Sequence, residues 1–165
     1  MKTISFFGHS QIFNKNSVKE KLMNKLRELI PQGFSRLLMG CHGNFDGISL
    51  STCLDYKKQF NDTIEINVVL TSFSFLKKDE YGNSQVDFYK EKGCDTIFYD
   101  IEEIFYKNRI TYSNKKMVDD SDLIICYVDM NSYRSGAKTA VKYALRQNKK
   151  VINLYDKEDR LKKSY

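Results

Sequence analysis

Three short segments of the sequence combine glycine with polar or charged side chains, and each follows an apolar run directly. They are GHSQ at 8–11, GCHGNFDG at 40–47 and DMNSYRSGAKT at 129–139. Glycine lets a backbone approach a phosphate closely, and the free N–H groups of a helix N-terminus supply donors and positive potential. The segments therefore indicate the binding of an anionic ligand.

Each segment alone is a weak signal, and the three at one sheet edge are a stronger one; the third segment contributes the residues that would bind the anion. Its candidate anion-binding residues, at the expected start of a helix, are Arg134, Ser135, Gly136, Lys138 and Thr139. We expect the backbone N–H groups at 136–138 to hold a phosphate, and Asp46 or Asn44 of the second segment to bond a ribose hydroxyl. Asp46→Ala and Gly136→Asp are each expected to weaken binding without unfolding the domain.

Predicted strands and helices alternate along the chain. Short apolar runs predict strands at 3–7, 35–39, 64–70, 95–99, 122–128 and 150–155. Apolar residues at helical spacing predict helices from a Ser17–Glu20 capping box to Pro31, at 47–60 behind Asp46 as N-cap, at 85–91, at 101–120 with an interruption, and at 136–147. A long loop is left at 71–84.

This alternation predicts an α/β fold, and fully apolar strands are typical of a parallel sheet that is covered on both faces. We expect a single-domain Rossmann-like three-layer sandwich with a mainly parallel sheet over 1–155, and a charged, frayed tail at 156–165. The same alternation could form a closed barrel, but such a barrel typically takes about 250 residues, more than the 165 of this chain. In an open sheet of this kind ligands bind beyond the carboxyl ends of the strands, where the three segments would lie.

Composition and charge narrow the function classes. No apolar run approaches the roughly 20 residues of a membrane span, and the N-terminus has no signal-peptide pattern, so we expect a cytoplasmic protein without a membrane partner. The net charge of +6 comes from 27 basic and 21 acidic residues that are interspersed. Such a diffuse excess does not indicate a dedicated nucleic-acid groove.

Cysteines and histidines do not indicate a disulfide or a metal site. The four cysteines form no CxxC pair and lie in or beside apolar stretches, which favours reduced, packed thiols. Cys41 and His42 are adjacent, a poor spacing for one zinc site even with His9. Adjacent side chains at a strand end also point apart, which disfavours a Cys41 nucleophile. We expect no metal and no cofactor.

Taken together, several segments resemble the SLOG superfamily: GHS, G…GNFDG, and NKKMVDDSDLIICYVD followed by SGAKTAVKYALRQNKKVINL. This superfamily comprises Rossmann-like proteins related to the DNA-processing protein DprA and to the lonely-guy phosphoribohydrolases, and its small bacterial and phage branch is the most similar. Its members bind nucleotides or nucleotide-derived ligands at the sheet edge and often form dimers. The resemblance implies a homo-oligomeric ligand sensor, sink or regulatory module.

The resemblance also implies which residues line the site. The matching positions in the first two segments are Gly8, His9 and Ser10, then Gly43, Asn44, Asp46 and Gly47. Asn114 and Lys115 approach from the preceding helix, and Ser135, Gly136 and Ala137 stand where the family has its phosphate-facing S-G-T triplet.

One position departs from the related glycosidic-bond enzymes. The phosphoribohydrolases and the nucleoside deoxyribosyltransferases carry a glutamate where this chain has Ala140. Their chemistry needs a carboxylate there, as nucleophile or to stabilise an oxocarbenium-like centre. We therefore expect a binding module. An enzyme that cleaves an N-glycosidic bond is the alternative, and it would need Glu102, Glu103 or Asp46.

Other interpretations stay open. His9 fits a helix cap or a bond to a backbone carbonyl as well as a ligand contact. DprA-like binding of single-stranded DNA would need a basic groove, with Lys107, Arg109, Lys115 and Lys116 as its candidates. Aromatic residues that flank loops, and of which one would stack on a base, are Tyr81, Phe88, Tyr89, Tyr112 and Tyr133.

Overall fold

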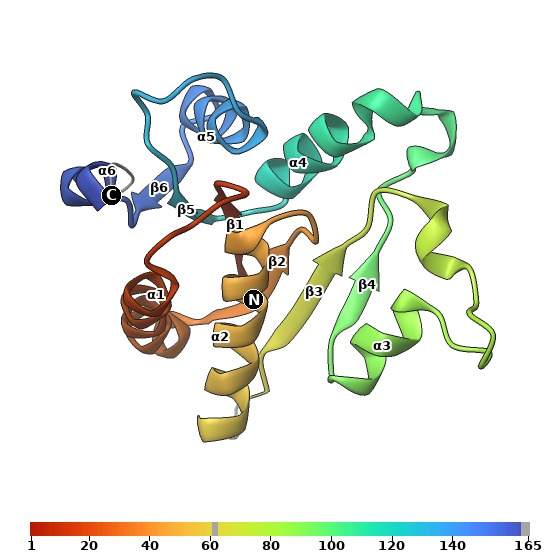
Figure 1. Cartoon of the computed structure of the whole chain (residues 1–165). Helices are drawn as coiled ribbons and strands as arrows, with labels where there is room; N and C mark the ends of the chain where they lie inside the picture. Colours follow the sequence, from red (N-terminus) through yellow and green to blue (C-terminus); the bar gives the residue numbers. More distant parts are fainter. Residues whose placement is uncertain (61–62, 163–165) are drawn as a thin grey trace.

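The computed structural model describes residues 1–60 and 63–162, with side chains described to Asp159. Six parallel strands form one sheet in the order β4-β3-β2-β1-β5-β6 (Figure 1). The strands are β1 (Lys2–Gly8), β2 (Phe34–Met39), β3 (Glu65–Val69), β4 (Asp95–Ile97), β5 (Leu123–Tyr127) and β6 (Lys150–Asn153). The prediction of a Rossmann-like α/β domain is confirmed.

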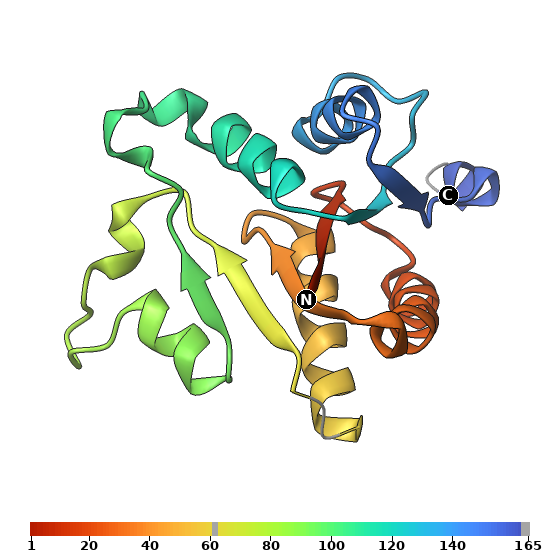
Figure 2. The ribbon, with the colours of Figure 1, turned by 180° about the vertical axis from the view of Figure 1, so that it is seen from behind.

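Helices cover both faces of the sheet (Figures 1 and 2). They are α1 (Lys15–Leu29), α2 (Asn44–Phe60), α3 (Gln85–Glu91), α4 (Arg109–Asp119), α5 (Gly136–Arg146) and α6 (Lys157–Lys162). Apolar side chains of α1, α2 and α3 pack on one face, and those of α4 and α5 pack on the other. The sheet is therefore the middle layer of three.

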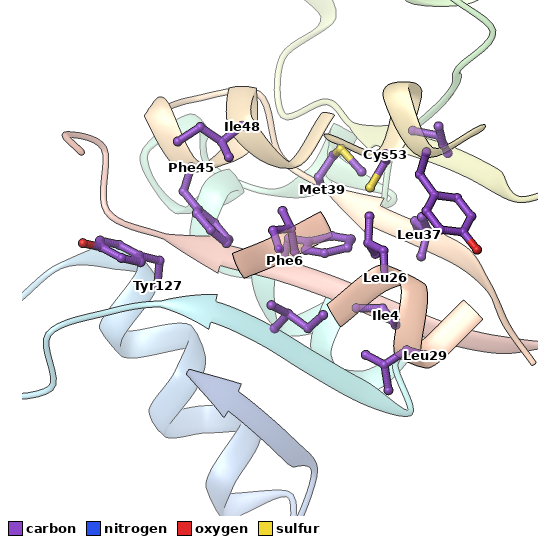
Figure 3. Packing of buried hydrophobic residues seen from close by; sticks show 14 of the residues in the cluster. Ile4, Phe6, Leu26, Leu29, Leu37, Met39, Phe45, Ile48, Cys53 and Tyr127 are labelled. Atoms are coloured by element: carbon purple, nitrogen blue, oxygen red, sulfur yellow. The ribbon is translucent and has the colours of Figure 1, made fainter. Parts of the chain in front are cut away.

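Alternating side chains of the central strands supply both cores. On the α1–α2 face, Ile4 and Phe6 of β1 and Met39 of β2 pack against Leu26 and Phe45 (Figure 3). On the opposite face, Phe7 and Leu38 pack in the cluster that includes Val118 of α4 and Val141 of α5. This alternation follows from the period of two along a strand.

The strand order creates a switch point between β1 and β5. From β1 the chain moves outward through β2 and β3 to β4, and then returns to place β5 on the other side of β1. In open sheets of this kind a crevice forms outside the carboxyl ends of the strands where the order reverses. The loops after β1 and β5 flank that point.

Two helix starts differ from the prediction. α1 begins at Lys15 with Asn14 as N-cap, so Ser17 and Glu20 lie inside the helix and form no capping box. α2 begins at Asn44, whose backbone N–H bonds to the carbonyl of Ser10, so Asp46 lies in the first turn and is not the N-cap. At α2 the boundary therefore coincides with a contact to another part of the chain.

The expectation of a frayed tail is wrong for the residues that the structure describes there. Residues 157–162 form α6, and the buried Asp159 accepts a hydrogen bond from the Asn14 side chain at 2.6 Å. Lys21 of α1 lies 3.9 Å from the same carboxylate. These contacts fasten the segment to the start of α1. No helix in the described part of the chain is long and apolar enough to cross a membrane.

Candidate functional site

Two adjoining cavities lie at the carboxyl ends of the central strands. The switch-point cavity, about 210 Å³, is lined by Gly8, His9 and Ser10 after β1, by Gly40, His42, Gly43 and Asp46 after β2, by Ile110 and Asn114 of α4, by Ser135, Gly136 and Ala137 at the start of α5, and by Phe6 and Phe7. The α4–α5 cavity, about 300 Å³, is lined by Thr111, Asn114, Lys115, Arg134, Ser135, Gly136, Thr139, Ala140 and Tyr143. They share Asn114, Ser135 and Gly136.

Most of the predicted site residues line one or both cavities. Those that do are Gly8, His9, Ser10, Gly43, Asp46, Asn114, Lys115, Arg134, Ser135, Gly136 and Thr139. Asn44, Gly47 and Lys138 line neither. The Asn44 side chain instead accepts a hydrogen bond from the backbone of Ile12 at 3.0 Å, and the Lys138 ammonium bonds to the carbonyl of Ser132 at 2.7 Å.

The glycines after β1 and β2 allow a close approach between elements. A Cβ on Gly8 would lie 2.3 Å from the ring of Phe45, the large buried side chain at the start of α2. A Cβ on Gly43 would lie 2.7 Å from the Cα of Ser10. Real Cβ atoms do not come this close, so both positions need glycine for packing alone.

His9 joins the loops after β1 and β5. Its backbone N–H bonds to the carbonyl of Tyr127, and its Nε2 accepts the backbone N–H of Asp129 at 2.8 Å. In this arrangement Nε2 carries no proton. The imidazole thus lines the switch-point cavity while it fixes the spacing of the two loops that form the crevice.

Asp46 organises the loop after β2 from inside the first turn of α2. Its carboxylate accepts the backbone N–H of His42 at 2.9 Å. Burial raises the pKa of this carboxyl above its ordinary value, and hydrogen bonds from the backbones of His42, Gly43 and Gly40 oppose that rise. Asp46→Ala would remove these bonds and disturb the loop locally. That the domain stays folded in this variant remains a prediction.

The first turn of α5 presents backbone donors to the cavity. Ser135 is the N-cap, and its hydroxyl accepts the N–H of Lys138 at 3.1 Å. The N–H of Thr139 bonds to the carbonyl of Ser135. In the part of the chain that the structure describes, the N–H groups of Gly136 and Ala137 have no acceptor. Both residues line the switch-point cavity, so two donors and the positive end of the helix are available to an anion there.

Two cations stand at the α4–α5 cavity. Lys115 and Arg134 are exposed, and neither forms an ion pair with a described residue. The Lys115 ammonium lies 5.7 Å from the centre of the Tyr143 ring, which also lines this cavity. The arrangement supplies positive charge next to the free N–H groups of α5.

Several lining residues were not predicted from the sequence. Gly40 and His42 belong to the second glycine-rich segment, and the sequence does not distinguish them there as lining residues. Ile110 and Thr111 lie one helical turn before Asn114 and Lys115, so they share a face of α4 with them. That four-residue spacing is the signal that would have found them.

Thiol and metal chemistry have little support at this edge. Burial, and then the charge of Asp46, raise the pKa of the Cys41 thiol to about 12, so it stays protonated near neutral pH. His42 bonds through Nε2 to the Thr71 hydroxyl at 2.8 Å. Among the residues described, no group of three or more His, Cys, Asp and Glu side chains could hold a metal ion.

The site can therefore hold an anion and polar groups. Its donors are the N–H groups of Gly136 and Ala137, its cations are Lys115 and Arg134, and its polar side chains include Asp46. No protein-family model matches the chain, and no curated protein matches it either.

Proposed function

We propose that the chain binds a nucleotide or a nucleotide-derived small molecule at the carboxyl edge of its sheet. One observation carries the proposal: the switch-point cavity opens between β1 and β5 with the N–H groups of Gly136 and Ala137 directed to no acceptor in the described chain. Free N–H groups at a helix start form a ready binding site for phosphate.

Charge and size support the same ligand class. Lys115 and Arg134 add two cations on the α4–α5 side of these donors. On the other side, Ser10, His42 and Asp46 offer hydroxyl, imidazole and carboxylate groups to a sugar. Together the cavities reach the size of a small-molecule site. The phosphate would lie at the residues that the cavities share, and the sugar would extend into the switch-point cavity.

SLOG membership is part of this proposal. The segments that resemble the superfamily lie at the cavities: the GHS turn after β1, the glycine-rich loop after β2 and the SGA start of α5. A site assembled from these three segments is what the resemblance implies.

The experiment is a thermal-shift screen against the nucleoside monophosphates, ADP-ribose and cyclic dinucleotides. A ligand present at about 100 times its dissociation constant adds about 2.7 kcal/mol to the free energy of unfolding, which gives a clear rise in Tm. Each stabilising compound is then recovered after incubation and analysed by chromatography. A compound recovered intact supports a sensor or sink. If millimolar concentrations of every compound leave Tm unchanged, the proposal is wrong.

Cleavage of an N-glycosidic bond is the second candidate, and the position of Asp46 favours it. Of the three carboxylates considered from the sequence, Glu102 and Glu103 are exposed on the 3-10 turn Ile101–Glu103, away from the switch-point cavity, whereas Asp46 lines it. Ala140, at the position of the family glutamate, lines the α4–α5 cavity and offers no carboxylate. A free base and a ribose phosphate in the chromatogram would establish this activity, and Asp46→Asn would then abolish it.

A further inference from the structure

A third hollow adjoins the switch-point cavity on its outer side. This mouth hollow, about 370 Å³, lies between the loop after β1 and the loop that leads into α5, and it shares His9, Ser10 and Ser135 with the switch-point cavity. Both loops leave the same end of the sheet (Figure 1). A ligand held at the start of α5 could thus extend outward into it.

Two aromatic side chains line the mouth hollow and stand in solvent. Phe13 is 66% exposed and Tyr133 is 95% exposed. Neither ring contacts another aromatic ring or a cation within residues 1–60 and 63–159. One ring comes from each of the two loops.

Other exposed phenylalanines of this protein behave differently. Phe73 stacks on Phe98 at 5.4 Å between ring centres, and Phe105 lies 4.8 Å from Tyr106. Phe88 and Tyr89 meet edge-on, with their ring centres 5.6 Å apart. Two large rings that stay without such a partner at the opening of a cavity have apolar area available for a flat ligand group.

We propose that Phe13 and Tyr133 stack on the nucleobase of the bound ligand, an inference that rests on the proposed function. The phosphate lies at Gly136, the sugar crosses the switch-point cavity, and the base occupies the mouth hollow. Gln11 and Ser132 also line the hollow and can bond to the edges of the base. Continuity through the three shared residues favours a base of the same ligand over a separate occupant.

The absence of tryptophan from the sequence makes a direct test possible. Tyr133→Trp introduces a single indole that keeps the capacity to stack. Its fluorescence should change on titration with AMP or GMP and stay constant with ribose 5-phosphate, which has the sugar and phosphate but no base. Tyr81→Trp is the control, because Tyr81 is 80% exposed but lies in the loop between β3 and α3, away from the hollow.

The affinity for AMP of two alanine variants gives a quantitative test of the stacking. Tyr133→Ala and Phe13→Ala should each weaken AMP binding roughly 5- to 150-fold, the range for loss of one base-stacking aromatic. The affinity for ribose 5-phosphate should not change. Both side chains are exposed, so neither substitution should unfold the protein.

The outcomes separate the inference from the proposed function. If AMP and ribose 5-phosphate bind the parent protein equally well, or if both alanine variants bind AMP as the parent does, the stacking inference is wrong and the phosphate site stands. If none of the nucleoside monophosphates, ADP-ribose, the cyclic dinucleotides and ribose 5-phosphate binds the parent protein, both the proposed function and the inference are overturned.

Discussion

One wall of the switch-point cavity, after β1 and β2, carries glycines at 8, 40 and 43, and the facing wall, the first turn of α5, carries Gly136. On the first wall an added Cβ would meet neighbouring atoms at 2.9 Å or less at each position. On the facing wall, a Cβ on Gly136 would meet nothing within 4 Å. Glycine thus allows tight packing on one wall and leaves open space before unbonded N–H groups on the other. The second arrangement is the one that serves a ligand.

The largest expected effect concerns Cys41, beside the packed wall. A rise of its pKa from 9.0 to about 12 lowers the thiolate fraction at pH 8 about a thousandfold. Iodoacetamide should therefore label Cys41 in the native protein far more slowly than a free thiol, with a rate that rises about tenfold per pH unit. Labelling followed by peptide mass spectrometry measures this, and the protein in urea is the control. Labelling at the rate of a free thiol would show that this wall is open.

Gly8→Ala tests the packed wall itself. The new methyl group would overlap the Phe45 ring, and the buried ring has no room to retreat. We expect a loss of about 3 kcal/mol in the free energy of unfolding. For a chain of this size that lowers Tm by roughly 6 to 12 °C. Gly136→Ala is the matched control and should leave Tm unchanged or raise it slightly. Equal Tm values for both variants would remove the distinction between the walls.

Gly136→Asp tests the open wall. The carboxylate would stand where the ligand phosphate is expected and repel it, so we expect AMP affinity to fall at least tenfold by calorimetry. An acidic residue suits a helix start, so Tm should hold or rise slightly. Gly47→Asp makes the same charge change near the start of α2, outside both cavities, and should leave affinity unaltered. Affinity within twofold of the parent would move the phosphate site elsewhere.

The sequence predicts the layers of this fold better than its contacts. Apolar runs and helical spacing predict every strand and the helices α1 to α5, because those patterns depend on burial against a sheet. The sequence does not predict the starts of α1 and α2. At α2 the backbone N–H of Asn44 bonds to a remote partner, the carbonyl of Ser10. The residues near a helix start do not indicate which distant residue will bond to it.

The site was predictable to the extent that it consists of loops at strand ends. Gly8 and Gly136 look alike in the sequence, and the partner that distinguishes them, Phe45, lies far along the chain from Gly8. Ile110, in the first turn of α4, and Tyr143, in α5, reach the cavities from helices, and the rotation of those helices against the sheet decides whether they do. That rotation is set by tertiary packing.

Gly47 gives the smallest expected effect and the sharpest test of where the cavity ends. It lies in α2, an added Cβ would meet nothing within 4 Å, and it lines neither cavity. Because glycine is a poor helix residue, Gly47→Ala should stabilise the protein by about 0.5 to 1 kcal/mol. AMP affinity should stay unchanged in calorimetry. A variant that is more stable but binds AMP more weakly would return Gly47 to the site that the sequence predicted. The cavity would then have to extend along α2, and the packed wall would itself contact the ligand.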